Sequence, residues 1–200
     1  QVAFLDAHPE VPLCHTLCDV IDAQSRVVGV RHGLGVVPAM GRIFERLLEH
    51  CWITISTVMV RKSLFDELGW FNPEAPYGYL GEDHEFFLRV ARRHPIGLVP
   101  EALAGFRKAG QGITAKNWKA NPEPVPLFQA LLKRRDIWEG MVSRQRMVRA
   151  LTDKCSENAY FCRARCEWGR AAWFARQALK ADLSDLRAWR HWAAALVQRT

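Results

Sequence analysis

The sequence lacks any apolar run long enough to span a membrane, and it has too few cysteines for a disulfide scaffold. No apolar stretch approaches the roughly 18 residues that a membrane-spanning helix requires. Six cysteines in 200 residues are sparse beside the small secreted domains that depend on disulfides, and the N-terminus carries no secretory signal. The sequence therefore argues against a membrane-embedded or disulfide-rich protein and predicts one that works in a reducing, cytoplasmic compartment.

The chain also lacks an initiating methionine. It begins at Gln1, within residues 1–7, which read as the end of a helix that Pro9 terminates. We therefore expect a further N-terminal part in the natural protein.

The composition supplies enough apolar residues for a packed core, together with an excess of positive charge. Hydrophobic residues make up 49% of the chain, and 28 Lys and Arg against 21 Asp and Glu give a net charge of +7. Clusters at 133–135 and 144–146 fit an anionic partner such as a sugar nucleotide or a phospholipid surface. Solvated helix faces carry such clusters too. No nucleic-acid-binding motif accompanies them, so a nucleic-acid partner is not expected.

Strand and helix patterns alternate over the first part of the chain, which predicts an α/β fold. The expected elements are a hairpin of residues 11–20 and 26–30, a helix over 41–48, a buried strand over 53–60, and a helix over 62–68 closed by Gly69. A central helix with an apolar stripe over 86–92 follows, and then a strand over 96–100 that continues over 103–108 after a turn.

The proline-rich elbow at 121–126 is not expected to be helical and marks a domain boundary. Beyond it, apolar residues recur at helical spacing, which predicts helices over 127–137, 142–151, 158–168, 170–181 and 185–198. We therefore divide the chain into an α/β part, 1–115, a proline-containing linker and helix, 116–140, and a small helical appendage, 141–200.

Adjacent carboxylates lie at the start of the central helix, whose apolar stripe runs over 86–92. Gly81 allows a tight turn and a close approach of the backbone to a ligand, and Glu82 and Asp83 then lie in the first helical turn, where unpaired N–H groups favour negative charge. An ionised carboxylate at that position suits a general base. Because acidic residues are common in the first turn of any helix, simple capping explains the same pattern.

Several motifs in order resemble the C-terminal half of a family 2 glycosyltransferase. They comprise the hairpin and the stretches Ser-Thr-Val-Met-Val-Arg-Lys-Ser-Leu-Phe at 56–65, Leu-Gly-Trp-Phe-Asn at 68–72, Gly-Glu-Asp-His-Glu-Phe-Phe-Leu-Arg at 81–89, and Pro-Glu-Ala-Leu-Ala-Gly-Phe-Arg at 100–107. The resemblance covers residues 1–115 and implies an incomplete GT-A fold of an inverting enzyme, which transfers a sugar from a nucleotide-sugar donor to the hydroxyl of a saccharide or lipid-linked acceptor.

The resemblance also implies roles for individual residues. Asp83 matches the general base of the family, Glu82 its partner, and Arg107 a basic residue near the donor diphosphate, although a surface arginine is the alternative. The family's divalent cation, Mg or Mn, would have its ligands in the preceding nucleotide-binding half, outside this chain, and no metal site is expected here. Ala109 stands where many relatives have a histidine, which weakens any phosphate or metal role for that loop.

Aromatic residues near these carboxylates have two possible roles. Trp70, Tyr77 and Tyr79 could form a stacking wall for the acceptor beside Gly81, or they could anchor loops in the core. The Gln-x-x-Arg-Trp motif of polymerising relatives is missing, so transfer of a single sugar is expected. The family also suggests a bacterial enzyme of cell-envelope polysaccharide synthesis, associated peripherally with the inner membrane.

The helical appendage resembles a tetratricopeptide hairpin followed by the start of another helix. A single repeat cannot bury its own apolar face, so we expect it to pack on the catalytic part or on a partner. Its cysteines at 155, 162 and 166 read as small core residues rather than metal ligands, and its tryptophans at 168, 173, 189 and 192 as helix-packing residues.

Two functions remain open at this point. The first is a glycosyltransferase part with Asp83 as its base, inactive on sugar nucleotides by itself because the donor half is missing. The second is a non-catalytic binding module that docks a protein or an anionic surface through its basic helical tail. The sequence leaves the donor, the acceptor and the oligomeric state undetermined.

Overall fold

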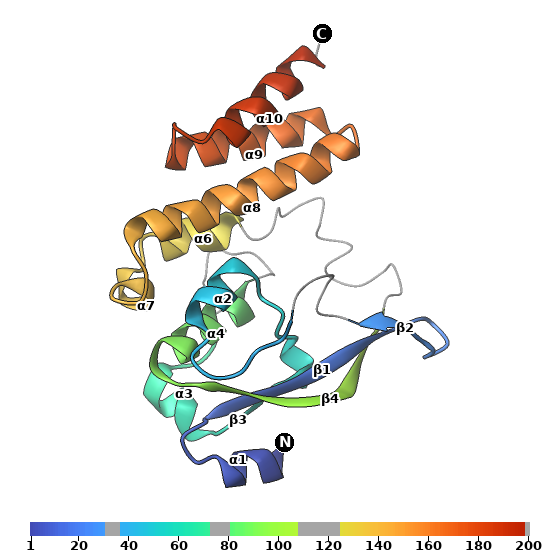
Figure 1. Cartoon of the computed structure of the whole chain (residues 1–200), viewed down its shortest axis with the longest axis vertical. Coiled ribbons are helices and arrows are strands. Elements are labelled where there is room, and N and C mark those ends of the chain that lie inside the picture. Colours follow the sequence, from blue (N-terminus) through green and yellow to red (C-terminus); the bar gives the residue numbers. More distant parts are fainter. Residues whose placement is uncertain (31–36, 73–80, 108–124, 199–200) are drawn as a thin grey trace. The chain divides into compact units, whose positions relative to one another are not determined.

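The computed structural model describes residues 1–30, 37–72, 81–107 and 125–198. These residues fall into two compact units, one formed by the described residues up to Arg107 and the other by those from Val125 onward. The first is a mixed α/β unit and the second is helical (Figure 1). The α/β class expected from the sequence is therefore confirmed.

The first unit is built on a four-stranded sheet with β1 (Leu13–Ile21) at its centre. β4 (Ile96–Arg107) runs parallel to β1 along its whole length, from the Leu13–Ile96 pair to the Ile21–Arg107 pair. Two antiparallel strands occupy the other edge of β1: β2 (Val27–Val30) pairs with its C-terminal end and β3 (Met59–Val60) with its N-terminal end. The predicted hairpin is confirmed.

β4 is one strand, where the sequence suggested two segments joined by a turn. The pairing with β1 shifts between Thr16 and Cys18, so residues of β4 are skipped from one pair to the next. Pro100 lies in this region, and because it has no N–H it cannot donate to the ladder. A bulge therefore absorbs the proline while the strand continues.

The expected buried strand over 53–60 is mostly wrong. Residues Ile55–Thr57 form a 3-10 turn, η1, and only Met59 and Val60 pair with β1. Both the backbone N–H and the hydroxyl of Thr57 donate to the Thr54 carbonyl, at 2.8 and 2.7 Å. These local bonds replace the ladder that the β-branched composition suggested, since Thr readily bonds to nearby backbone.

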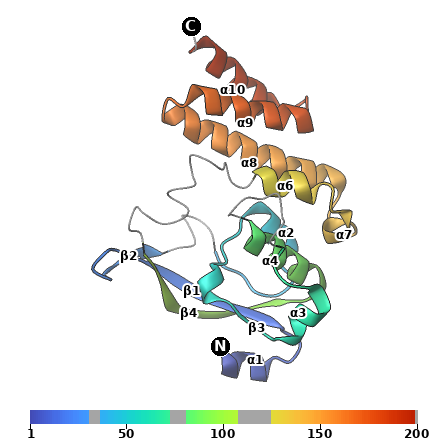
Figure 2. The same ribbon diagram turned by 180° about the vertical axis from the view of Figure 1, so that it is seen from behind.

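Helices cover both faces of this sheet. α1 (Val2–Ala7) packs on the face that carries Cys14, where Phe4 lies so close to Gly97 of β4 that a side chain at this position would collide with its ring. α2 (Phe44–Glu49) and α4 (Glu82–Arg93) lie side by side on the opposite face, as Figures 1 and 2 both show. α3 (Ser63–Leu68) ends at Gly69, whose φ of 77° is a backbone conformation that residues other than glycine rarely adopt.

A buried histidine in β1 is expected to make the stability of this unit depend on pH. His15 is 1% exposed, and among the described residues its Nε2 has no hydrogen-bond partner. Burial lowers its pKa from the ordinary value, against smaller opposing effects of hydrogen bonds with the Thr16 and Ala39 backbone. As pH falls below about 6.5, the unfolded chain therefore takes up the proton before the folded chain does.

We expect the melting temperature of the chain to fall as the pH is lowered from about 7 to about 5, and His15→Asn to reduce this fall. Thermal unfolding at several pH values, followed by circular dichroism, measures it. His191 of the second unit, whose pKa burial also lowers, contributes in the same direction, so His191→Asn is the matched comparison. An unchanged pH dependence in the His15 variant would refute the assignment.

The second unit consists of a short pair of helices followed by three longer ones. α6 (Val125–Leu131) and α7 (Arg135–Trp138) come from the segment expected to hold a linker and one helix. The predicted helix over 127–137 is interrupted at 132–134, and α6 begins earlier, at Val125. Pro126 is accommodated because the first helical turn needs no N–H donor from it.

α8 (Arg144–Ala164) is a single helix of 21 residues, whereas the sequence suggested two with a break between them. Polar residues at the suggested break are buried along the helix: Thr152 donates its hydroxyl to the Arg149 carbonyl at 3.1 Å, and Asn158 donates its amide to the Lys154 carbonyl at 2.8 Å. Because these side chains bond to their own helix, they can be buried without ending it.

α9 (Trp168–Ala181) and α10 (Leu186–Val197) complete the unit, close to their predicted bounds. α8, α9 and α10 pack on one another in succession (Figure 1). Many of the residues buried in them are small, such as Ala159, Ala175 and Ala188, which lets helices approach closely. Trp173 and Trp189, expected to pack between helices, contact the rings of Phe174 and Trp192 and are 41% and 42% exposed. Among the described residues, no helix combines the length and apolar character needed to cross a bilayer.

Candidate active site

The candidate site is the start of α4, where the structure places three acidic residues in one helical turn. Gly81 precedes the helix with φ 124° and ψ −8°, a backbone conformation that other residues rarely adopt. Glu82, Asp83 and Glu85 follow in the first turn. The backbone N–H of His84 donates to Asp83 Oδ1 at 2.7 Å. The glycine and the paired carboxylates are thus arranged as the sequence predicted.

Buried contacts hold this end of α4 rigidly in the first unit. His84 is buried, and its Nε2 lies 2.7 Å from the Leu47 carbonyl of α2, so that ring nitrogen donates the hydrogen bond. Phe87 and Leu88, in the following turn, are fully buried. A half-buried carboxylate at Asp83 is therefore carried by a helix end that cannot shift without breaking the core.

Glu85 and Arg89 form an ion pair beneath the site that also fixes the loop after α3. The guanidinium of Arg89 contacts both carboxylate oxygens of Glu85, at 3.0 and 2.9 Å, and the two side chains are 14% and 1% exposed. Arg89 also donates to the carbonyls of Leu68 and Gly69, at 2.6 and 3.3 Å, and to that of Trp70 at 2.9 Å. One arginine therefore joins α4 to the segment that carries Trp70.

The sequence alone did not indicate this pair, or His84. The spacing of Glu85 and Arg89, four residues apart in a helix, was the available signal because such residues face each other. That spacing does not show that the pair would be buried, or that the arginine would also bind three backbone carbonyls.

Glu82 differs from Asp83 in its surroundings. Its Oε2 atom is buried, and within the described part of the chain it has no hydrogen-bond partner. A carboxylate oxygen left in this state is unusual in a folded protein.

Trp70 has features of both roles considered for it, a loop anchor and a stacking surface for the acceptor. It stacks on Phe65 with ring centroids 4.3 Å apart and an interplanar angle of 6°, and Phe65 in turn stacks on Phe86 of α4. Trp70 nevertheless remains 67% exposed. The ring is held by the aromatic cluster while presenting a large area to solvent. Tyr77 and Tyr79, the other two aromatic residues considered for the acceptor, lie outside the described residues.

Arg107 is the last residue of β4, and its side chain forms hydrogen bonds with the turn of the β1–β2 hairpin. Its guanidinium donates to the Asp22 carbonyl at 2.7 Å, the Ala23 carbonyl at 3.3 Å and the Ser25 hydroxyl at 3.0 Å. These bonds give it a structural role at the C-terminal end of the parallel strand pair. Contact with a donor diphosphate stays a prediction.

The described residues do not gather His, Cys, Asp and Glu side chains into a group able to hold a metal ion. This part of the chain therefore does not by itself fit the divalent cation that the glycosyltransferase resemblance implies. The ligands were expected outside the chain, and removal of a proton by Asp83 would require only its own carboxylate.

Comparison of the sequence with protein-family models finds no match, and comparison with curated proteins finds none either.

Proposed function

We propose that this chain is the acceptor-side part of an inverting, GT-A-type glycosyltransferase of family 2, with Asp83 as the general base. The proposed donor is a nucleotide sugar, and the proposed acceptor is a hydroxyl of a saccharide or of a lipid-linked sugar. The observation that carries the proposal is the position of Asp83, in the first helical turn directly after Gly81, whose positive φ is a conformation suited to glycine.

The surroundings of Asp83 support this role in three ways. The N-terminal end of α4 favours a negative charge, which keeps a carboxylate able to accept a proton. The Glu85–Arg89 pair and the His84 contact keep that turn in place. The exposed ring of Trp70 is tied to the same helix through Arg89, where a flat apolar surface suits one face of a sugar ring.

In the proposed reaction, Asp83 takes the proton of the acceptor hydroxyl as that oxygen forms a bond to the anomeric carbon of the donor. The bond from the anomeric carbon to the diphosphate oxygen breaks, and the nucleoside diphosphate leaves with the bonding electrons. The configuration at the anomeric carbon inverts. A divalent cation, when bound by the intact enzyme, would stabilise the charge on the leaving diphosphate.

The test is the stereochemistry of transfer by the full-length product of the gene. Incubation with a panel of nucleotide sugars and saccharide acceptors, followed by NMR of the product, is expected to show release of nucleoside diphosphate and an inverted anomeric centre. Retention of configuration, or no transfer to any acceptor of the panel, would contradict the proposal. The isolated 200 residues serve as the comparison and are expected to be inactive.

A further inference from the structure

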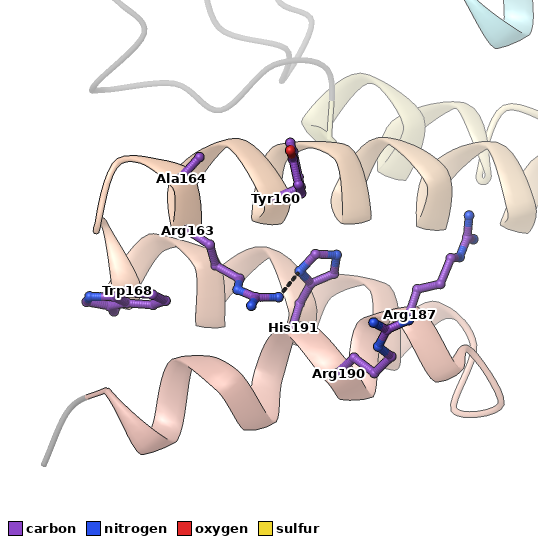
Figure 3. A pocket seen from close by; sticks show the side chains of 7 residues that line it. All are labelled: Tyr160, Arg163, Ala164, Trp168, Arg187, Arg190 and His191. Carbon is purple, nitrogen blue, oxygen red and sulfur yellow. Dashed lines mark hydrogen bonds between the residues drawn. The ribbon is translucent and has the colours of Figure 1, made fainter.

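The second unit contains a pocket that plays no part in the proposed transfer reaction. It has a volume of about 560 Å³ and is formed by α8, the start of α9, and α10. Figure 3 shows its lining, in which Arg163 of α8 and His191 of α10 point toward each other. The lining residues are Tyr160, Arg163, Ala164, Trp168, Arg187, Arg190 and His191.

The lining carries three arginines and no acidic residue, and only one of the arginines is neutralised. Arg187 makes ion pairs with Asp153 at 2.7 Å and with Asp185 at 3.1 Å. Within the described part of the chain, no carboxylate pairs with Arg163 or Arg190. Two positive charges at the pocket are therefore left without a partner of opposite sign.

Arg163 adds a donor that is already removed from water. Its Nε is buried and has no hydrogen-bond partner among the described residues. Its Nη1 lies 3.2 Å from Nδ1 of His191. Because an arginine is always protonated and can only donate, Nδ1 must be the acceptor, which leaves the ring proton on Nε2. An unmade hydrogen bond at a buried guanidinium is costly. Because arginine has five N–H donors, the guanidinium of Arg163 that lines the pocket can also donate to a bound oxyanion.

His191 is held in its neutral form by the same surroundings. Burial lowers its pKa, and the charges of Arg163, Arg190 and Arg187 act in the same direction, against the opposing effect of Asp185. The histidine therefore offers a neutral N–H donor beside the two unpaired arginines. All of these groups favour a ligand that is rich in acceptors and negatively charged.

Charge and size together narrow the class of ligand. A phosphate monoester carries a charge of about −1.5 to −2 at pH 7, which matches two unpaired arginines, whereas a carboxylate would neutralise only one. Guanidinium groups also suit phosphate geometry. A volume of about 560 Å³ exceeds what a phosphate fills and lies in the range of small-molecule sites. Tyr160 and Trp168 supply flat walls for the remainder.

We propose that this pocket binds a small, soluble phosphate monoester, with the phosphate on Arg163 and Arg190 and a ring-bearing group against Tyr160 and Trp168. The proposal concerns the helical unit alone and does not depend on the transferase activity.

The test uses the whole chain and two probes of the same shape. Phenyl phosphate is a dianion near pH 7.5, and phenyl sulfate is a monoanion. Calorimetric titration is expected to show at least about tenfold tighter binding of the phosphate, because it can engage both arginines. Inorganic phosphate is expected to bind more weakly than phenyl phosphate. Equal affinity for the two phenyl esters, or for phenyl phosphate and inorganic phosphate, would overturn the proposal.

Arginine variants locate the binding. Arg190→Gln changes an exposed side chain and leaves the fold intact, and Arg163→Gln removes the buried donor; each is expected to weaken phenyl phosphate binding about tenfold. Arg176→Gln is the matched control, since Arg176 is an exposed arginine of α9 that lines other surface grooves. Unchanged affinity in the Arg190 variant would refute the site, whatever the folding of the Arg163 variant.

Two further readouts separate this site from other anion binding. Phenyl phosphate is expected to raise the pKa of His191, followed by NMR titration of its ring, because a dianion offsets the repulsion from the neighbouring arginines. Vesicles of phosphatidylcholine with phosphatidic acid test a lipid source. Binding to these vesicles without binding of phenyl phosphate would assign the charges to a membrane surface and contradict the proposal.

Discussion

Asp83→Asn is expected to lower sugar transfer by the full-length gene product by about 10²–10⁴-fold, the usual contribution of a general base. The amide has the same shape and can still accept the hydrogen bond from the His84 backbone N–H, so the start of α4 keeps its structure. It cannot take the proton of the acceptor hydroxyl. Initial rates of nucleoside diphosphate release measure the loss, and circular dichroism confirms that the fold is retained.

Two other variants make this result specific to Asp83. Asp66→Asn changes an exposed acidic residue in the first turn of α3 and is expected to leave the rate unchanged, because a carboxylate on another helix takes no part in the proton transfer. Glu82→Gln is expected to lower the rate by less than the Asp83 variant but more than the Asp66 variant. The change removes the negative charge next to Asp83, but the base itself remains. Full activity in the Asp83 variant would leave capping as the role of this carboxylate and favour the binding-module function.

Arg89→Met is expected to destabilise the chain by about 3–5 kcal/mol, the range found when one partner of a buried ion pair is removed. The change leaves Glu85 without its partner at a position that is 1% exposed. It also removes the donor for the carbonyls of Leu68, Gly69 and Trp70. Urea unfolding measures the loss of free energy, and hydrogen exchange of the α4 amides assigns it to the first unit.

The matched control lies one turn further along the same helix. Arg93 pairs with Glu67 at 3.3 Å, and these side chains are 56% and 41% exposed, so Arg93→Met is expected to cost less than about 1 kcal/mol. The double variant Glu85→Leu with Arg89→Met is expected to lose less than the sum of the single changes, because no charge is left unpaired. Equal losses of unfolding free energy in the Arg89 and Arg93 variants would show that the buried pair stabilises the chain no more than the exposed one.

Local signals in the sequence were sufficient where one residue type alone meets a backbone requirement. Gly69 predicts the end of α3 and Gly81 the turn before α4, since both positions have positive φ. The apolar stripe of α4 likewise predicts its helix, because one buried face is enough to set the helical period. The positions of Glu82 and Asp83 could be predicted once the turn at Gly81 and the helix after it were recognised, because the two carboxylates directly follow this glycine.

Tertiary structure decided what depends on partners far along the chain. Residues 53–60 have a β-branched composition, but a strand also needs a neighbour to pair with, and β1 offers one only to Met59 and Val60. α8 continues through polar residues because their side chains form hydrogen bonds within the helix, as Asn158 does, while α9 and α10 pack against it. No local pattern shows such neighbours in advance.

The same division applies to the functional groups. The sequence by itself determined which residues carry acid, base or aromatic chemistry, and that Glu82 and Asp83 begin a helix. Only the fold decided that Arg107 binds the hairpin turn, that Arg89 ties three carbonyls to α4, and that Arg163 and Arg190 share a pocket with His191. The physical reason is that an arginine side chain reaches several ångströms, so its partner depends on which backbone or charge the packed elements bring within that reach.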